Sequence, residues 1–126
     1  METTEPTILV AVTDIFFYTK VRDALKAGYR LEKARTQQDV AEKTATTTPA
    51  AVILDMNDLT IDAFLAIETL KANPHSKAVP ILAYANHEEV ETWNRAKTLG
   101  VTKIVSRNEF SARTRDLVEE VTKVAQ

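Results

Sequence analysis

The stretch Ala50-Ala51-Val52-Ile53-Leu54-Asp55 decides the fold of this chain. Five apolar residues follow one another without polar alternation, which is typical of a strand buried on both faces of a parallel sheet. Pro49 precedes the run, and the carboxylate of Asp55 ends it. Because open α/β sheets place their chemistry at the carboxyl ends of their central strands, Asp55 is predicted to open onto the functional site.

Short apolar runs alternate with amphipathic stretches on both sides of this segment. Strands are expected over residues 7–12, 29–34, 50–56, 79–84 and 101–106. Helices are expected over residues 15–27, from 36 to about 45, from 60 to about 72, from 86 to 100, and from 108 onward. Five strand–helix units in one short chain predict a single parallel sheet with helices on both faces.

Glycine and helix-capping residues mark the expected boundaries. The chain has only two glycines, Gly28 and Gly100, and each falls between a helix and the following strand. Thr60 and Asn108 are predicted to cap the third and the last helix, and Asn86 with Glu89 resembles a capping box.

The expected architecture is a three-layer, doubly wound α/β fold of the (βα)5 flavodoxin-like type. The predicted strand order is 2-1-3-4-5, because this order places the most apolar strands, the first, third and fourth, at the centre. We expect one domain over residues 1–126, with a core from about 7 to 124.

Composition excludes several classes of function. The chain has 126 residues, no cysteine and a net charge of -2, so thiolate metal sites are excluded and nucleic acid is not an expected partner. No apolar run approaches transmembrane length, and the polar opening residues 1–6 do not resemble a signal peptide, so a cytoplasmic protein without membrane contact is expected. No glycine-rich phosphate loop and no nucleophile–base pair is visible, so an enzyme is not expected.

Four segments resemble the receiver domain of bacterial two-component response regulators, the CheY-like family. They are residues 8–12, 49–55, 80–83 and 100–107. The resemblance extends over nearly the whole chain and places Asp55 at the phospho-acceptor position. It implies a histidine kinase as phosphoryl donor, and a magnesium ion held by the acceptor carboxylate, an acid pair after the first strand and a backbone carbonyl.

The chain departs from that family at most positions of the site. The corresponding residues here are Val12, Thr13, Asp14, Asn57, Ala85 and Arg107. The family's acid pair is replaced by Val12 and Thr13, with only Asp14 nearby, and its switch hydroxyl by Ala85. Its lysine becomes Arg107. The aromatic position of the fifth strand becomes Ile104 and the proline after the lysine becomes Asn108, while Asn57 can still offer the carbonyl.

Loss of the acid pair predicts poor magnesium binding. Mg²⁺ demands near-octahedral oxygen ligation, and without it the charge on a transferring phosphoryl group is poorly neutralised. We therefore expect no metal, or at most weak Mg²⁺ at Asp14 and Asp55, and no other cofactor. The sequence resembles an atypical, stand-alone member of the family with a degraded phosphorylation site.

Several side chains carry both a functional and a structural interpretation. Arg107 is a candidate to form a bidentate ion pair with Asp55, or is a surface residue at a helix start. His87 is a candidate neighbour of Asp55, or an exposed first-turn residue. Trp93 and Ile104 are candidates for an interaction face, and the alternative for Trp93 is packing against the sheet.

The expected function is that of a stand-alone receiver-like signalling module in a phosphorelay, which acts by protein–protein interaction. Its expected partners are a histidine kinase or a downstream target, and a homodimer through the face from the fourth helix to the last is a further candidate. A phosphorylation-independent pseudo-receiver that serves as an adaptor is the alternative. A flavodoxin-like cofactor binder is the third hypothesis.

Overall fold

Five parallel strands form one sheet in the order β2-β1-β3-β4-β5, as the sequence predicts. The structure is a computed structural model that describes residues 5–124, apart from the side chain of Val124. Residues 1–4 and 125–126 lie outside the described part. The expectation of no signal peptide depends partly on residues 1–4. The strands are β1 (Thr7–Ala11), β2 (Arg30–Lys33), β3 (Ala51–Asp55), β4 (Ile81–Ala85) and β5 (Lys103–Ser106).

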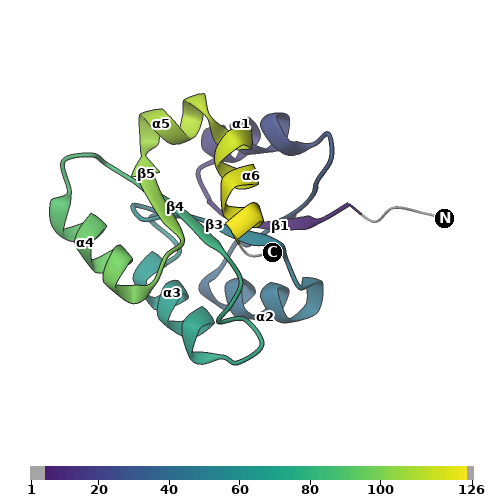
Figure 1. Ribbon diagram of the computed structural model, residues 1–126, viewed down its shortest axis with the longest axis horizontal. Helices are drawn as coiled ribbons and strands as arrows, with labels where there is room; N and C mark the ends of the chain where they lie inside the picture. The colour runs from purple at the N-terminus through teal and green to yellow at the C-terminus, as the bar shows by residue number, and fades with distance from the viewer. Residues whose placement is uncertain (1–4, 125–126) are drawn as a thin grey trace.

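Helices cover both faces of this sheet (Figure 1). They are α1 (Ile15–Leu25), α2 (Gln37–Thr47), α3 (Ala63–Ala72), α4 (Val90–Leu99), α5 (Arg107–Ala112) and α6 (Thr114–Val124). Buried residues of α2, α3 and α4 share one core cluster with one face of the strands, and those of α1, α5 and α6 share a second cluster with the other face. No helix in the described part of the chain is long and apolar enough to span a membrane.

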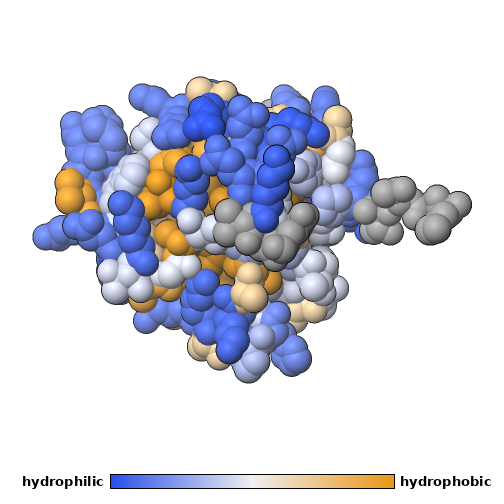
Figure 2. All heavy atoms as spheres, in the orientation of Figure 1, coloured by the Kyte–Doolittle hydropathy of each residue, from blue (hydrophilic) through white to orange (hydrophobic). Residues whose placement is uncertain are grey.

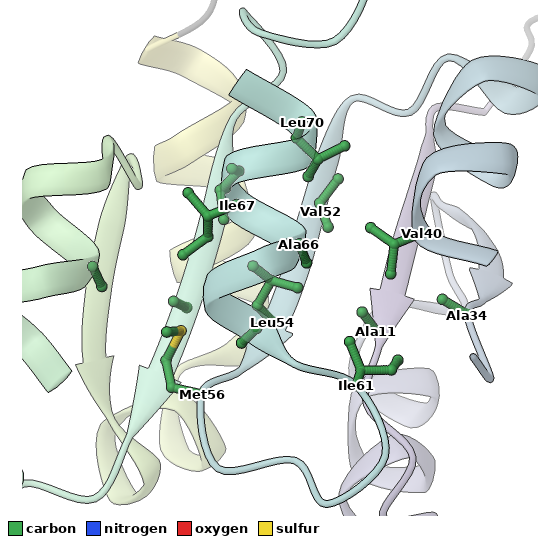
Figure 3. Packing of buried hydrophobic residues seen from close by; sticks show 14 of the residues in the cluster. Ala11, Ala34, Val40, Val52, Leu54, Met56, Ile61, Ala66, Ile67 and Leu70 are labelled. Carbon is green, nitrogen blue, oxygen red and sulfur yellow. The ribbon is translucent and has the colours of Figure 1, made fainter. Parts of the chain in front are cut away.

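The central strand β3 supplies both clusters, because its successive side chains point to opposite faces. Val52 and Leu54 belong to the first cluster, and Ile53 belongs to the second. Figure 3 shows Ala66 and Leu70 of α3 close to Val52 and Leu54. Each fully buried Leu or Ile contributes about 1.5–3 kcal/mol relative to an exposed one, so this strand anchors the sheet.

Two helices begin at residues other than the predicted caps. The third helix begins after Asp62, whose side chain accepts a hydrogen bond from the Leu65 amide at 3.0 Å, and not at Thr60. The Thr60 amide instead binds Asp58 at 2.9 Å, which holds this residue in the preceding loop. The fifth helix begins after Ser106, whose Oγ accepts from the Glu109 amide at 3.0 Å, and not at Asn108.

The predicted capping box at Asn86 and Glu89 is absent. Glu89 precedes α4 without a side-chain capping bond, because its carboxylate instead accepts a hydrogen bond from Asn57 Nδ2 at 2.7 Å. The side chain of Asn86 accepts a weak bond from the Glu88 amide at 3.3 Å, which forms a turn and not a helix start.

The expected last helix is interrupted at Arg113. Its backbone, with φ -132° and ψ 32°, leaves the helical region and separates α5 from α6. Its guanidinium donates to Glu109 and Glu120 at 2.8 Å each, so one side chain bridges the two helices across the interruption.

Figure 2 shows hydrophilic side chains over α4 and α6, with hydrophobic residues visible over β5 between them.

Candidate functional site

Asp55 ends β3 at the carboxyl edge of the sheet, where the sequence places it. The residue is 4% exposed, and Oδ1 accepts a hydrogen bond from the Asn57 amide at 2.8 Å. The surrounding pocket has a volume of about 460 Å³ and is open to solvent. Its walls include the side chains of Thr13, Asp14, Asp55, Asn57, Asp58 and Arg107. The pocket therefore brings together residues from the ends of β1, β3 and β5.

Arg107 approaches Asp55 but does not form the predicted bidentate pair. Its Nη1 lies 3.9 Å from Asp55 Oδ1, at the outer limit of an ion pair. The guanidinium carbon lies over the Phe17 ring, 4.7 Å from its centroid, and 5.8 Å from that of Tyr84. Stacking on the two aromatic rings holds the guanidinium away from the position of a bidentate ion pair with the carboxylate. Arg107 therefore contacts both the rings and Asp55.

Tyr84 forms the aromatic floor beneath Arg107. Its ring stacks on Phe17 at a centroid distance of 4.8 Å and on Phe110 at 4.4 Å. Tyr84 lies in register with Asp55 on the adjacent strand and is fully buried, and its hydroxyl has no hydrogen-bond partner among the described residues. Burial, followed by the negative charge of Asp55, raises the pKa of this hydroxyl far above its ordinary value.

The environment of Asp55 disfavours its charged form. Burial raises the pKa of the carboxyl above the ordinary value of 3.8. The Asn57 amide, the charge of Arg107 and the nearby Tyr84 hydroxyl act in the opposite direction but do not cancel this effect. The hydroxyl is thus near enough to influence Asp55, although no hydrogen bond of accepted geometry joins the two.

Asp58 is the site residue whose role sequence reasoning missed. Its carboxylate accepts the Thr13 amide at 2.7 Å and the Thr13 hydroxyl at 2.8 Å, and the amides of Thr60 and Ile61 at 2.9 Å each. Partial burial raises the pKa of Asp58, but the hydrogen bonds from Thr13, Ile61 and Thr60 outweigh burial and hold it below the ordinary value. The only signal in the sequence is the pattern Asp58-Leu59-Thr60, which is typical of a side chain that binds the backbone of its own turn.

The acids of the site do not fit a divalent cation. Asp14 Oδ1 caps α1 through the amides of Phe16 and Phe17 at 2.9 and 3.1 Å. Both oxygens of Asp58 are occupied by the donors described above, and Val12, which is fully buried, offers no ligand. Within residues 5–124, no group of three or more acidic or histidine side chains is arranged to hold a metal ion. Magnesium needs several convergent oxygens, and the carboxylate of Asp58 is already engaged by Thr13 and by the amides of its own loop.

The remaining predicted site residues lie outside the pocket. Ala85 is fully buried and carries no hydroxyl, and the exposed His87 lies 3.9 Å from Glu88 as its one ion-pair partner among the described residues. Trp93 is half-buried against the first core cluster, and its indole N–H donates to the Asn86 carbonyl at 3.0 Å. Ile104 is 8% exposed and belongs to the same cluster, so its predicted place on an interaction face is wrong: its side chain points into the core.

No protein-family model and no curated protein matches the sequence. Solved structures do resemble this one. The receiver domain of a sensor histidine kinase from Pseudomonas aeruginosa PAO1, with magnesium in its active-site cleft, superposes with a TM-score of 0.83 at 15% identity, over 95% of this chain and 99% of that one. Full-length FixJ from B. japonicum gives a TM-score of 0.83 at 20% identity, over 98% of this chain and 61% of that one.

A third similar structure is the signal receiver domain of a signal transduction histidine kinase from Syntrophus aciditrophicus. It gives a TM-score of 0.82 at 16% identity, over 94% of this chain and 91% of that one. Two of these three structures, those from Pseudomonas aeruginosa and Syntrophus aciditrophicus, are receiver domains of histidine kinases. The fold of this chain is therefore the CheY-like receiver fold, a flavodoxin-like α/β arrangement with strand order 2-1-3-4-5.

Proposed function

We propose that this chain is a single receiver-like domain, over residues 1–126, that acts in two-component signalling by binding other proteins and not by catalysing a reaction. In this proposal Asp55 is held by the charge of Arg107 in place of a magnesium ion. The observation that supports it is that Arg107, and not a set of acids, lies next to Asp55. Arg107 lies 3.9 Å from Asp55, while the other two acids, Asp14 and Asp58, are engaged by backbone amides.

This arrangement favours the phosphorylation-independent form of the module. Transfer of a phosphoryl group to a carboxylate needs cationic neutralisation of the three equatorial oxygens, usually by a metal ion. A single arginine that also stacks on Phe17 supplies less charge at that point. The proposed partners are a histidine kinase or a downstream target in the cytoplasm, with no role for nucleic acid given the net charge of -2.

The alternative is a module that accepts a phosphoryl group on Asp55. Its support is the position of Asp55 at the end of β3, beside an open pocket of about 460 Å³ with an arginine at its edge.

A homodimer through α4, β5 and α5 is a separate proposal, and sedimentation at increasing protein concentration tests it directly.

Intact-mass measurement separates the two forms. The protein is incubated with acetyl phosphate and magnesium chloride, with Asp55→Asn as the control for the site. We expect no phosphoryl adduct on the wild-type chain. A triple variant that restores family groups, Thr13→Asp with Ala85→Thr and Arg107→Lys, should gain an adduct that depends on magnesium. A wild-type adduct that disappears in Asp55→Asn would overturn the proposal and establish the phosphorelay alternative.

A further inference from the structure

The exposed large apolar side chains gather at the edge of the sheet that carries the pocket. They are Ile15, Phe16, Leu59, Leu65 and Val90, with exposures of 59, 79, 101, 46 and 63%. Each lies in a segment that follows a strand: the start of α1, the β3–α3 loop, the start of α3 and the start of α4. Single exposed apolar residues are normal on a protein surface, but their concentration at one edge is typical of a binding surface.

The same edge carries an excess of negative charge. Asp14, Asp55 and Asp58 line the pocket, and Glu89 joins them through its hydrogen bond to Asn57 at 2.7 Å. Arg107 is the one cationic side chain that lines the pocket among the described residues. Complementary charge steers association and selects partners, so this edge favours a cationic partner.

Asp55, which lines the pocket, has unused hydrogen-bonding capacity. A carboxylate offers about four acceptor positions, yet the nearly buried Asp55 accepts one hydrogen bond, from Asn57, and a long ion-pair contact from Arg107. The neighbouring Tyr84 hydroxyl is fully buried and has no partner within the described residues. Asp55 can therefore accept further hydrogen bonds from a group that enters the pocket.

We propose that the edge of the sheet around this pocket binds a segment of a partner protein. That segment directs a lysine or arginine side chain to Asp55 and places apolar neighbours on Phe16 and Leu59. The proposal names the partner chemistry of the site and rests on the proposed function. An ammonium or guanidinium group needs one carboxylate and local acceptors, whereas a metal ion needs several convergent oxygens, and those of Asp58 are engaged by Thr13 and its own loop. Arg107 is 38% exposed and its guanidinium also stacks on Phe17, so the cation of the partner would compete with Arg107 for Asp55.

Selection from a display library of short random peptides tests this proposal without knowledge of the natural partner. The bait is the intact chain, and peptides that also bind the Asp55→Asn variant are discarded. We expect the surviving peptides to share a lysine or arginine flanked by apolar residues. Replacement of that basic residue by glutamine in a synthetic peptide should weaken binding by about tenfold or more, as expected for loss of one desolvated charge pair.

Two variants of the chain check the location. Leu59→Ser should weaken binding of the peptide, because it removes an apolar contact of the proposed surface. Leu59 is fully exposed, so its replacement leaves the core intact. Glu68→Gln is the matched charge control, since Glu68 is an exposed acid on α3 away from the pocket lining, and it should bind as the wild type does. Enriched peptides without a basic residue, or the absence of any peptide that prefers the wild-type chain over Asp55→Asn, would each overturn the proposal.

Failure of this inference is distinguishable from failure of the proposed function. A phosphoryl adduct on Asp55 contradicts the proposed function, whatever the peptides do. Peptide selection without a basic consensus contradicts the inference alone, while the wild-type chain still lacks an adduct.

Discussion

The carboxylate of Asp58 receives both the backbone amide and the hydroxyl of Thr13, at 2.7 and 2.8 Å. These residues lie 45 positions apart in the chain, so the contact ties the loop after β1 to the loop after β3. The contact consists of a hydroxyl and a backbone amide that both bind one acid. A direct protein contact thus joins the two loops across the pocket.

Asp58→Ala should destabilise the protein by about 1–2 kcal/mol, because it leaves part-buried donors of the two loops without an acceptor. Chemical unfolding monitored by circular dichroism measures the change, with Glu68→Gln as the control. The pKa of Asp58 is lowered on folding, so its contribution is present above the ordinary value of 3.8 and is lost as the pH falls through the folded value. The wild-type advantage over Asp58→Ala should therefore shrink at acidic pH; a constant difference would contradict this account.

Asp55→Asn should stabilise the protein at neutral pH. Folding raises the pKa of Asp55, so the folded state holds its proton more tightly than the unfolded state does. Stability is consequently lost as the pH rises from 3.8 through the folded pKa, and the amide removes this loss. Thermal unfolding of both proteins over a pH series checks the sign: the advantage of the variant should grow with pH and then level off. A variant less stable than the wild type at neutral pH would refute it.

Tyr84→Phe should leave stability unchanged or raise it by up to about 1 kcal/mol, since it removes a buried hydroxyl without a partner and keeps the ring. Phe110→Ala, which removes a ring from the same stack, should cost about 3–5 kcal/mol and serves as the contrast. Urea unfolding measures both. A loss above about 1 kcal/mol in Tyr84→Phe would mean that the hydroxyl has a hydrogen-bond partner in solution.

Gly100→Ala should destabilise the protein by about 1 kcal/mol, because the backbone at this position lies in the left-handed region, with φ +102°. The added Cβ would also lie 3.2 Å from Cε of Lys71, which must move aside. Thr98→Ala, at an exposed position of the same helix, should stabilise the protein by up to about 0.7 kcal/mol and is the control for helix propensity. Equal stabilities of Gly100→Ala and the wild type would show that the end of α4 relaxes without cost.

The sheet could be predicted from the sequence because its signals are local. The apolar run before Asp55, the glycine that ends α4 and the alternation of strands with amphipathic stretches together imply one topology, although α1 ends at Leu25 and not at Gly28. The helix starts at Thr60 and Asn108 were wrong because several neighbouring residues can cap a helix. Contacts between loops decide which of them does, and at the third helix Asp58 fixes the Thr60 amide in the loop.

The site could be predicted only in part. The position of Asp55 follows from the strand that precedes it, but the partners of Asp58 and Arg107 come from distant segments. Arg107 rests on Phe17 because α1 and α5 pack on the same face of the sheet, which no local pattern reveals. The resemblance to the receiver family likewise suggested an interaction face at Ile104, but this side chain is 8% exposed and packs in the core.

Trp93 is the only tryptophan of the chain, and its indole N–H is bonded to the Asn86 carbonyl just beyond β4. Indole emission responds to hydrogen bonding and to contact with water. The protein therefore carries an intrinsic fluorescent reporter of the β4–α4 loop, and ligand-driven rearrangement of that loop can be followed without attaching a dye.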